Sequence, residues 1–189
     1  MKKSSIHKFL RRRFFLKEAF FSFLFLTASL PPVFAVASDI QTFYGPEGHL
    51  ADRIALLYDE ARKSIYVACF NITSQPLSKA LIKAKIRGVD VRVIIDRGEY
   101  ENNQTHRAVS MLVKAGIPVK TNRHEGLMHI KQAVIDGQIN TSGSFNQTWN
   151  ADHVNDERLD LITDAGNSKK ALEKFLAMWG DTDRFEELK

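Results

Sequence analysis

Hydrophobic residues follow two different spacings along residues 38–189. Some stretches are short and continuously apolar, such as SIYVACFNI, which is typical of a strand covered on both faces. Others repeat apolar residues at helical spacing, as Ile54, Leu57 and Ala61 do. We therefore predict strands over 40–46, 64–72, 89–96, 117–121 and 157–164, and helices over 50–62, 73–88, 105–116 and 168–179.

The order of these elements predicts the fold class. Strands alternate with helices in the first half, which is typical of a layered α/β domain. Residues 128–145 then read as two strands joined by a hairpin turn at Asp136-Gly137. We therefore predict one α/β domain over 38–189, with a mixed β-sheet layered with helices.

Residues 1–37 have the pattern of an export signal. A basic start is followed by an uncharged apolar stretch and then by Ala35 and Ala37, small residues at the spacing that signal peptidases accept. The segment RRFFLK, residues 12–17, resembles the twin-arginine export motif. We expect cleavage after Ala37 and a periplasmic or secreted product; the alternatives are general secretion and an uncleaved membrane anchor.

The net charge depends on which part of the chain is counted. The whole chain carries a formal +5, but the part after residue 37 has 20 basic and 21 acidic residues, a formal −1. Within it, residues 61–131 have 13 basic and 5 acidic residues, whereas 132–189 have 6 and 11. The basic half could face a polyanion, or it could be a solvated helix surface.

The single cysteine and the histidines give no sign of a metal site or a cofactor. Cys69 lies in an apolar run and is expected to be a buried strand thiol. The histidines after residue 37 are scattered, without an HExxH pattern or paired carboxylates. We therefore expect neither a metal nor a cofactor, with a divalent-metal hydrolase as the rival enzyme class.

Residues 129–146, HIKQAVIDGQINTSGSFN, place several polar groups at fixed spacing. Side chains two apart on a strand share a face, so His129 and Lys131 should point the same way. Ser144 and Asn146 end the returning strand, which we expect to lie beside the histidine. Imidazole can attack phosphorus or carry a proton, lysine neutralises phosphate oxygens, and hydroxyl and amide groups hydrogen-bond to them. This set is suited to phosphoryl transfer without a metal ion.

The same segment matches the HKD signature of the phospholipase D superfamily, which is His-x-Lys, four residues, Asp, six residues and Gly-Ser-x-Asn. The stretches SIYVACFNITSQPLSKALIKAKIRGVDVRVIID, LVKAGIPVK and VNDERLDLI also resemble the small, single-motif bacterial Nuc-type endonucleases of this superfamily. The likeness covers roughly residues 43–179.

The resemblance implies a role for each motif residue. His129 would be the nucleophile, Lys131 and Asn146 would bind phosphate oxygens, and Ser144 would support the phosphate or the histidine. Glu157 would hydrogen-bond to the histidine and orient it, and Asp136 would serve the architecture more than the chemistry. Ile130 and Gln132 depart from the Asn and aromatic residue of some relatives, but both are expected on the opposite face of the strand.

One motif supplies only one histidine, whereas in-line displacement needs a nucleophile and a leaving-group acid on opposite sides of phosphorus. We therefore expect a symmetric homodimer with the active site at its two-fold axis. The resemblance favours DNA or RNA as substrate, with phospholipid as the alternative and a non-catalytic binding protein as a further one. Phe145 and Trp149 could stack on a base, touch an acyl chain or pack in the core.

Overall fold

The structure is a computed structural model that describes residues 38–188; residues 1–37 and residue 189 lie outside the described part. The predicted export signal therefore lies outside it. Among the helices of residues 38–188, none has the length and apolar character needed to cross a membrane.

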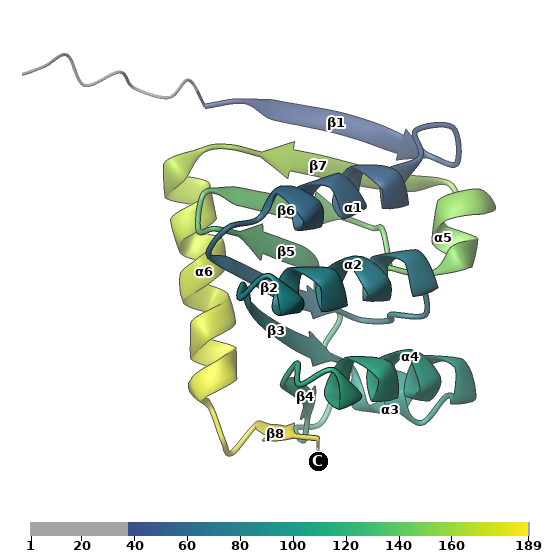
Figure 1. Cartoon of the computed structure of the whole chain (residues 1–189), viewed down its shortest axis with the longest axis vertical. Coiled ribbons are helices and arrows are strands. Elements are labelled where there is room, and N and C mark those ends of the chain that lie inside the picture. Colours follow the sequence, from purple (N-terminus) through teal and green to yellow (C-terminus); the bar gives the residue numbers. More distant parts are fainter. Residues whose placement is uncertain (1–37, 189) are drawn as a thin grey trace, which may run out of the picture. The chain divides into compact units, whose positions relative to one another are not determined.

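The described chain is built on one eight-stranded sheet with the strand order β1-β7-β6-β5-β2-β3-β4-β8 (Figure 1). Strands β2, β3 and β4 are parallel, and the other neighbouring pairs are antiparallel. The strands are β1 (Ile40–Gly45), β2 (Ser64–Cys69), β3 (Asp90–Ile95), β4 (Val119–Asn122), β5 (Lys131–Ile135), β6 (Ile139–Gly143), β7 (Glu157–Ile162) and β8 (Phe185–Glu187). The predicted mixed α/β sheet is confirmed.

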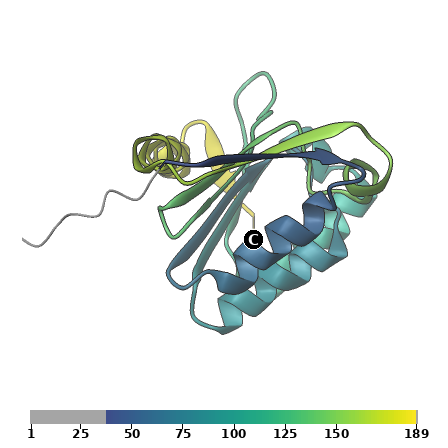
Figure 2. The ribbon, with the colours of Figure 1, turned by 90° about the horizontal axis from the view of Figure 1, so that it is seen from above.

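Helices lie on both faces of this sheet (Figure 2). The helices are α1 (Leu50–Glu60), α2 (Gln75–Ile86), α3 (Arg97–Tyr100), α4 (Asn103–Lys114), α5 (Trp149–His153) and α6 (Ala165–Gly180). The larger core lies between one face and α1, α2 and α4, and the smaller core lies between the other face and α6. Layers of this kind bury the apolar face of each helix and both faces of the central strands.

Side-chain alternation along β2 accounts for the two cores. Ile65 and Val67 belong to the larger core, whereas Tyr66 and Ala68 belong to the smaller one. The ring of Tyr66 stacks on Phe175 of α6 with a centroid distance of 5.0 Å. Because both faces of β2 are covered, its sequence is apolar throughout rather than alternating.

Helix α2 lies within the predicted range 73–88 and is two residues shorter at each end. The Ser74 side chain accepts a hydrogen bond of 3.4 Å from the backbone N–H of Leu77, and Pro76 stands in the first turn, where it needs no hydrogen-bond partner. Gly88 follows the helix with φ of 91°, a conformation that costs glycine little. These local signals start α2 at Gln75, six positions after the last residue of β2, Cys69.

Three short elements and several boundaries differ from the sequence expectation. The elements α3, α5 and β8 were not predicted, because each has three to five residues and too little periodicity to detect. The first hairpin strand begins at Lys131, so His129 lies in the segment just before it. This segment still contacts the sheet, because Phe70 N–H donates to Ile130 O at 2.9 Å.

Candidate active site

Four strand ends meet at one edge of the sheet and bring the motif residues together. Strand β2 is antiparallel to β5, with Cys69 opposite Lys131, and β6 is antiparallel to β7, with Gly143 opposite Leu159. The segments that follow β2 and β6 and those that precede β5 and β7 therefore lie at the same edge. These segments and the first residues of β5 and β7 carry five of the six predicted site residues: His129, Lys131, Ser144, Asn146 and Glu157.

His129 is exposed, and its ring lies against Phe70, the residue that follows β2. The two ring centroids are 4.8 Å apart and the planes are tilted by 59°. Lys131 Nζ donates to the backbone oxygen of His129 at 3.1 Å and lies 4.8 Å from the centroid of the Phe70 ring. Phe70 thus contacts both the imidazole of His129 and the ammonium of Lys131. Phe70 was not among the site residues expected from the sequence. The one sequence signal for it was its position at the end of a buried strand.

Lys131 is partly withdrawn from water. Burial lowers its pKa below the ordinary lysine value, while the charges of Cys69, Glu157 and Glu99 raise it by less. A half-buried ammonium beside an exposed imidazole can neutralise the charge that develops on a phosphoryl group.

Ser144 and Glu157 form the other side of the site. The Ser144 hydroxyl donates to the Glu157 carboxylate and accepts a 3.0 Å hydrogen bond from the backbone N–H of Arg158. Asn155 Nδ2 donates to the other carboxylate oxygen of Glu157 at 3.2 Å. Within residues 38–188 no hydrogen bond joins Glu157 to His129, so the orienting contact that the resemblance implied is replaced here by a contact to Ser144.

The motif glycine allows this side of the site to form. Gly143 has a φ of 143°, and a Cβ atom there would lie 2.1 Å from the backbone oxygen of Arg158. The backbone of β6 therefore approaches β7 more closely than any side chain permits. This approach places Ser144 beside the start of β7, where it reaches Glu157.

Asn146 lies in the segment that runs from β6 to α5. The next residue, Gln147, donates its backbone N–H to Asn71 O at 3.1 Å, which ties this segment to the one that follows β2. The side-chain oxygen of Asn146 is buried and has no hydrogen-bond partner among the described residues. This oxygen is an acceptor, so it can take a hydrogen bond from a bound water or from another donor.

Asp136 is not brought to the site. It follows the opposite end of β5, five residues after Lys131, which is roughly 16 Å along a strand. Its carboxylate accepts backbone hydrogen bonds from Ser64 at 2.9 Å, from Lys63 at 2.7 Å and from Arg62 at 3.0 Å. Partial burial raises the pKa of Asp136, but these hydrogen bonds outweigh the burial and hold the pKa below its usual value. This position fits an architectural role.

The other residues singled out in the sequence divide between core and surface. Cys69 is buried, as predicted, and burial raises the pKa of its thiol to about 11, so it is inert as a nucleophile. Phe145 is also in the core, whereas Trp149 is 60% exposed. Among residues 38–188, no three His, Cys, Asp or Glu side chains are grouped so that they could hold a metal ion.

Residues 54–179 match a family described as cardiolipin synthase, PLD-like domain. The chain belongs to the phospholipase D superfamily. A phospholipase D from Rickettsia prowazekii is 32% identical over 142 residues, which cover 75% of this chain and 66% of the relative. A mitochondrial cardiolipin hydrolase from Xenopus tropicalis is 30% identical over 131 residues, 69% of this chain and 61% of the relative. The chain thus spans about two thirds of the length of these phospholipase D-superfamily relatives.

Two solved structures of the superfamily share the fold. The Nuc protein from Salmonella typhimurium, a phospholipase D family member, has a TM-score of 0.75 and 27% identity, covering 80% of this chain and 99% of that one. NucT from Helicobacter pylori has a TM-score of 0.70 and 25% identity, covering 75% and 96%. The predicted likeness to the small Nuc-type members is confirmed, and the chain is a phosphodiesterase-type hydrolase of the phospholipase D superfamily.

Proposed function

We propose that the protein is a metal-independent nuclease that cleaves phosphodiester bonds of DNA or RNA through a phosphohistidine intermediate. The observation that carries this proposal is the gathering of His129, Lys131, Ser144 and Asn146 at one exposed sheet edge. The fold of Nuc, almost all of which this chain covers, supports the same conclusion.

In the first step, an imidazole nitrogen of His129 attacks phosphorus and forms a P–N bond, while the P–O bond to the leaving group breaks. The Lys131 ammonium and the Asn146 amide stabilise the negative charge on the non-bridging oxygens. A proton must reach the leaving oxygen on the opposite side of phosphorus. In the second step, water attacks phosphorus and gives up a proton, and the P–N bond breaks to release His129.

The second proton-transfer group would come from another copy of the chain. One His129 cannot stand on both sides of phosphorus, and a two-fold axis through the site supplies a second imidazole that first donates the proton and later accepts one from water. Two large apolar side chains close to the motif residues in the sequence are exposed: Leu127, two residues before His129, is 62% exposed, and Val154, three residues before Glu157, is 61% exposed. A second copy that covers the site would also remove these two side chains from water.

Phospholipid hydrolysis is the second candidate, because the Rickettsia prowazekii and Xenopus tropicalis relatives are named phospholipase D and cardiolipin hydrolase. Purified residues 38–189 should be assayed on single-stranded DNA, plasmid, RNA and phosphatidylcholine, with EDTA present. We expect nucleic-acid cleavage that EDTA does not inhibit and that His129→Asn abolishes. Turnover of phosphatidylcholine alone would make the protein a phospholipase, and loss of all turnover in EDTA would contradict the metal-independent mechanism.

The shared site is tested by mixing chains. Wild type is allowed to exchange subunits with excess His129→Asn, so that most wild-type chains enter mixed dimers. Each mixed dimer has one histidine and cannot complete the cycle, so activity should fall well below simple dilution. Activity proportional to the wild-type chain, or a fully active monomer in light scattering, would contradict the shared site.

We also propose that residues 1–37 direct export to the periplasm or the medium, with cleavage after Ala37. The support is their sequence pattern, with Arg12 and Arg13 at the start of the twin-arginine-like segment. Replacing both arginines with lysine should retain the precursor in the cytoplasm. Continued export would indicate general secretion, and an unshortened membrane-bound product would indicate an anchor.

A further inference from the structure

A groove of about 690 Å³ opens beside the catalytic edge, between α2, α4 and α5. Its lining includes His106, Arg107 and Lys114 of α4, Gln75 of α2 and Trp149 of α5. In Figure 1, α4 lies beside α2, and α5 lies near the start of α2. This groove contains none of the motif residues, so the chemistry described above does not account for it.

The groove suits an anion. None of the residues that line it is acidic, although residues 38–189 as a whole carry slightly more acidic than basic residues. Arg107 and Lys114 are exposed, and neither forms an ion pair within residues 38–188. They are seven residues apart on α4, so they lie on the same helix face. Two free cations along an acid-free groove can contact successive phosphates of a strand.

Trp149 gives this groove an aromatic surface. It is 60% exposed, although one side of its indole ring stacks on His153 with a centroid distance of 4.7 Å and an interplanar angle of 9°. His153 Nδ1 also lies 3.1 Å from the backbone oxygen of Trp149. One face of the indole is therefore occupied by His153, and the side chain remains largely open to solvent.

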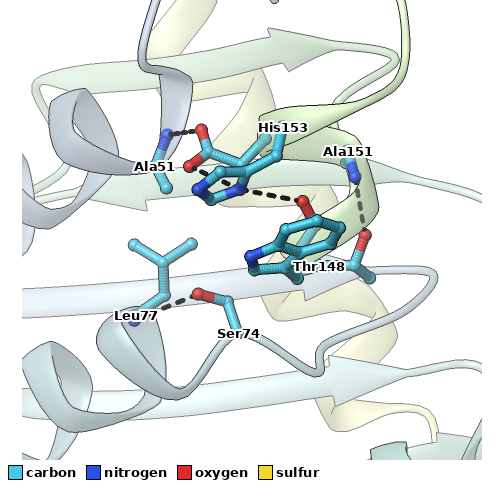
Figure 3. A network of polar contacts seen from close by, with 8 residues as sticks. Ala51, Ser74, Leu77, Thr148, Ala151 and His153 are labelled. Carbon is cyan, nitrogen blue, oxygen red and sulfur yellow. Dashed lines mark hydrogen bonds and ion pairs between the residues drawn. The ribbon is translucent and has the colours of Figure 1, made fainter. Parts of the chain in front are cut away.

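A network of hydrogen bonds fixes α5, and with it Trp149 (Figure 3). The Asp152 carboxylate accepts from Ala51 N–H of α1 at 2.8 Å and lies 3.5 Å from His153 Nδ1. The Thr148 hydroxyl accepts from Ala151 N–H at 3.2 Å. An aromatic ring on a fixed helix loses little conformational freedom when a ligand stacks on it.

The groove is joined to the active site through two adjacent segments. The backbone N–H groups of Thr73 and Ser74 both donate to Gln147 O at 2.9 Å. Thr73 is three residues after Phe70, and Trp149 is three residues after Asn146, a span of at most roughly 10 Å. A strand bound at the catalytic edge can therefore continue into the groove.

We propose that this groove binds the single-stranded nucleic acid next to the bond that is cleaved, with a base stacked on Trp149 and phosphates on Arg107 and Lys114. The inference rests on the proposed nuclease function and adds a preference for unpaired strands. A base inside a duplex has both faces covered by its neighbours, whereas an unpaired base can leave the stack and lie on an indole ring.

Binding of a labelled, short single-stranded oligonucleotide to the inactive His129→Asn protein tests the groove by fluorescence anisotropy. Adding Trp149→Ala should weaken binding about tenfold, the effect of losing one base stack, whereas Trp149→Phe should retain most of the affinity. Arg107→Ala and Lys114→Ala should each lower the salt slope of binding by about 0.7. Lys170→Ala, which removes an exposed cation from α6, is the matched control and should change neither quantity.

A direct signal complements the variants. The chain has two tryptophans, so Trp179→Phe leaves Trp149 as the sole indole. The oligonucleotide should quench the fluorescence of that protein. Unquenched fluorescence, or an unchanged affinity in Trp149→Ala, would contradict the groove while leaving the nuclease function intact.

Two further outcomes would also overturn the groove assignment. A monomer formed by Trp149→Ala in light scattering would place Trp149 in the dimer interface. If Trp149→Ala loses binding to phosphatidylcholine vesicles but keeps its affinity for the oligonucleotide, Trp149 is a lipid contact. These two outcomes differ from a failure of the nuclease proposal itself. In that case the wild-type protein would cleave no nucleic acid.

Discussion

The ring of Phe70 lies 4.8 Å from that of His129, and Lys131 Nζ lies 4.8 Å from the Phe70 centroid. One aromatic side chain at the end of β2 thus contacts both the proposed nucleophile and the proposed phosphate-binding cation. It limits the positions of the imidazole ring and shields the ammonium from water.

Phe70 should therefore act as a positioning residue. We expect Phe70→Leu to lower kcat by about tenfold to a hundredfold, since misplacing a reacting group by about 1 Å can cost a hundredfold. Phe70→Tyr should retain most of the wild-type kcat, because it keeps the aromatic ring. Because Phe70→Leu admits water to Lys131, the alkaline limb of the pH–rate profile should also move to higher pH.

A matched control for this prediction is Phe43→Leu. Phe43 also carries a cation on its ring, with the Arg53 guanidinium 3.6 Å from the centroid, but it lies on β1 outside the motif. Phe43→Leu should change neither kcat nor the pH profile. If Phe70→Leu lowers only thermal stability and leaves kcat and the pH profile unchanged, Phe70 is merely a packing residue.

Lys131 should contribute charge rather than bulk. Lys131→Ala should lower kcat/KM on bis(p-nitrophenyl) phosphate by about a hundredfold or more, because a charge-stabilising contact is lost. Lys131→Arg should recover only part of the activity, since a planar guanidinium does not replace a compact ammonium.

The pH profile separates the two Lys131 variants. Burial lowers the pKa of Lys131, so its charge is lost at a lower pH than that of a free lysine. As the pH rises, wild-type activity should therefore begin to fall before the pH reaches about 10.4, the ordinary pKa of lysine. In Lys131→Arg this decline should disappear, because arginine stays charged throughout that range. An unchanged alkaline limb in Lys131→Arg would show that another group titrates there.

Gly143 should be intolerant of any side chain. In Gly143→Ala the new methyl group would meet the Arg158 backbone oxygen, so β6 and β7 must separate at the site. We expect a loss of at least about 1–3 kcal/mol in the free energy of unfolding, measured with urea, together with loss of activity. Gly180→Ala is the control: it ends α6, a Cβ there meets nothing within 4 Å, and it should be neutral or slightly stabilising.

Asp136 should affect stability more than catalysis. Asp136→Asn should lower the free energy of unfolding at neutral pH by about 1–2 kcal/mol, allowing for the partial exposure of the carboxylate. The folded pKa is lowered, so the carboxylate stabilises the protein above the unfolded pKa of about 3.9, and this is lost as pH falls through the folded value. The difference between wild type and Asp136→Asn should therefore shrink in acid.

The control for this prediction is Asp183→Asn, which removes an exposed carboxylate that has no hydrogen bond or ion pair among residues 38–188. Its unfolding curves should follow those of wild type at each pH. A severe loss of kcat in Asp136→Asn at full stability would place Asp136 in the chemistry despite its distance.

The sequence by itself determined the layers of the fold and the chemical groups of the site. Continuous apolar runs such as 64–69 indicated strands buried on both faces, because alternate residues must each meet a helix layer. The spacing of His129, Lys131 and Gly143 indicated that these residues lie at one end of the hairpin, because its second strand returns the chain to the end where the first strand began. Both inferences depend on distances along one or two strands.

Only the tertiary structure decided which residues surround those groups. Phe70 reaches His129 because β2 lies next to β5, although 59 residues separate the two side chains in the sequence. Glu157 accepts a hydrogen bond from Ser144 because β6 packs against β7. Phe145 is buried and Trp149 is exposed because the packing around α5 sets where each side chain points. Such contacts join segments far apart in the chain, and their geometry depends on the pairing of strands that local spacing does not specify.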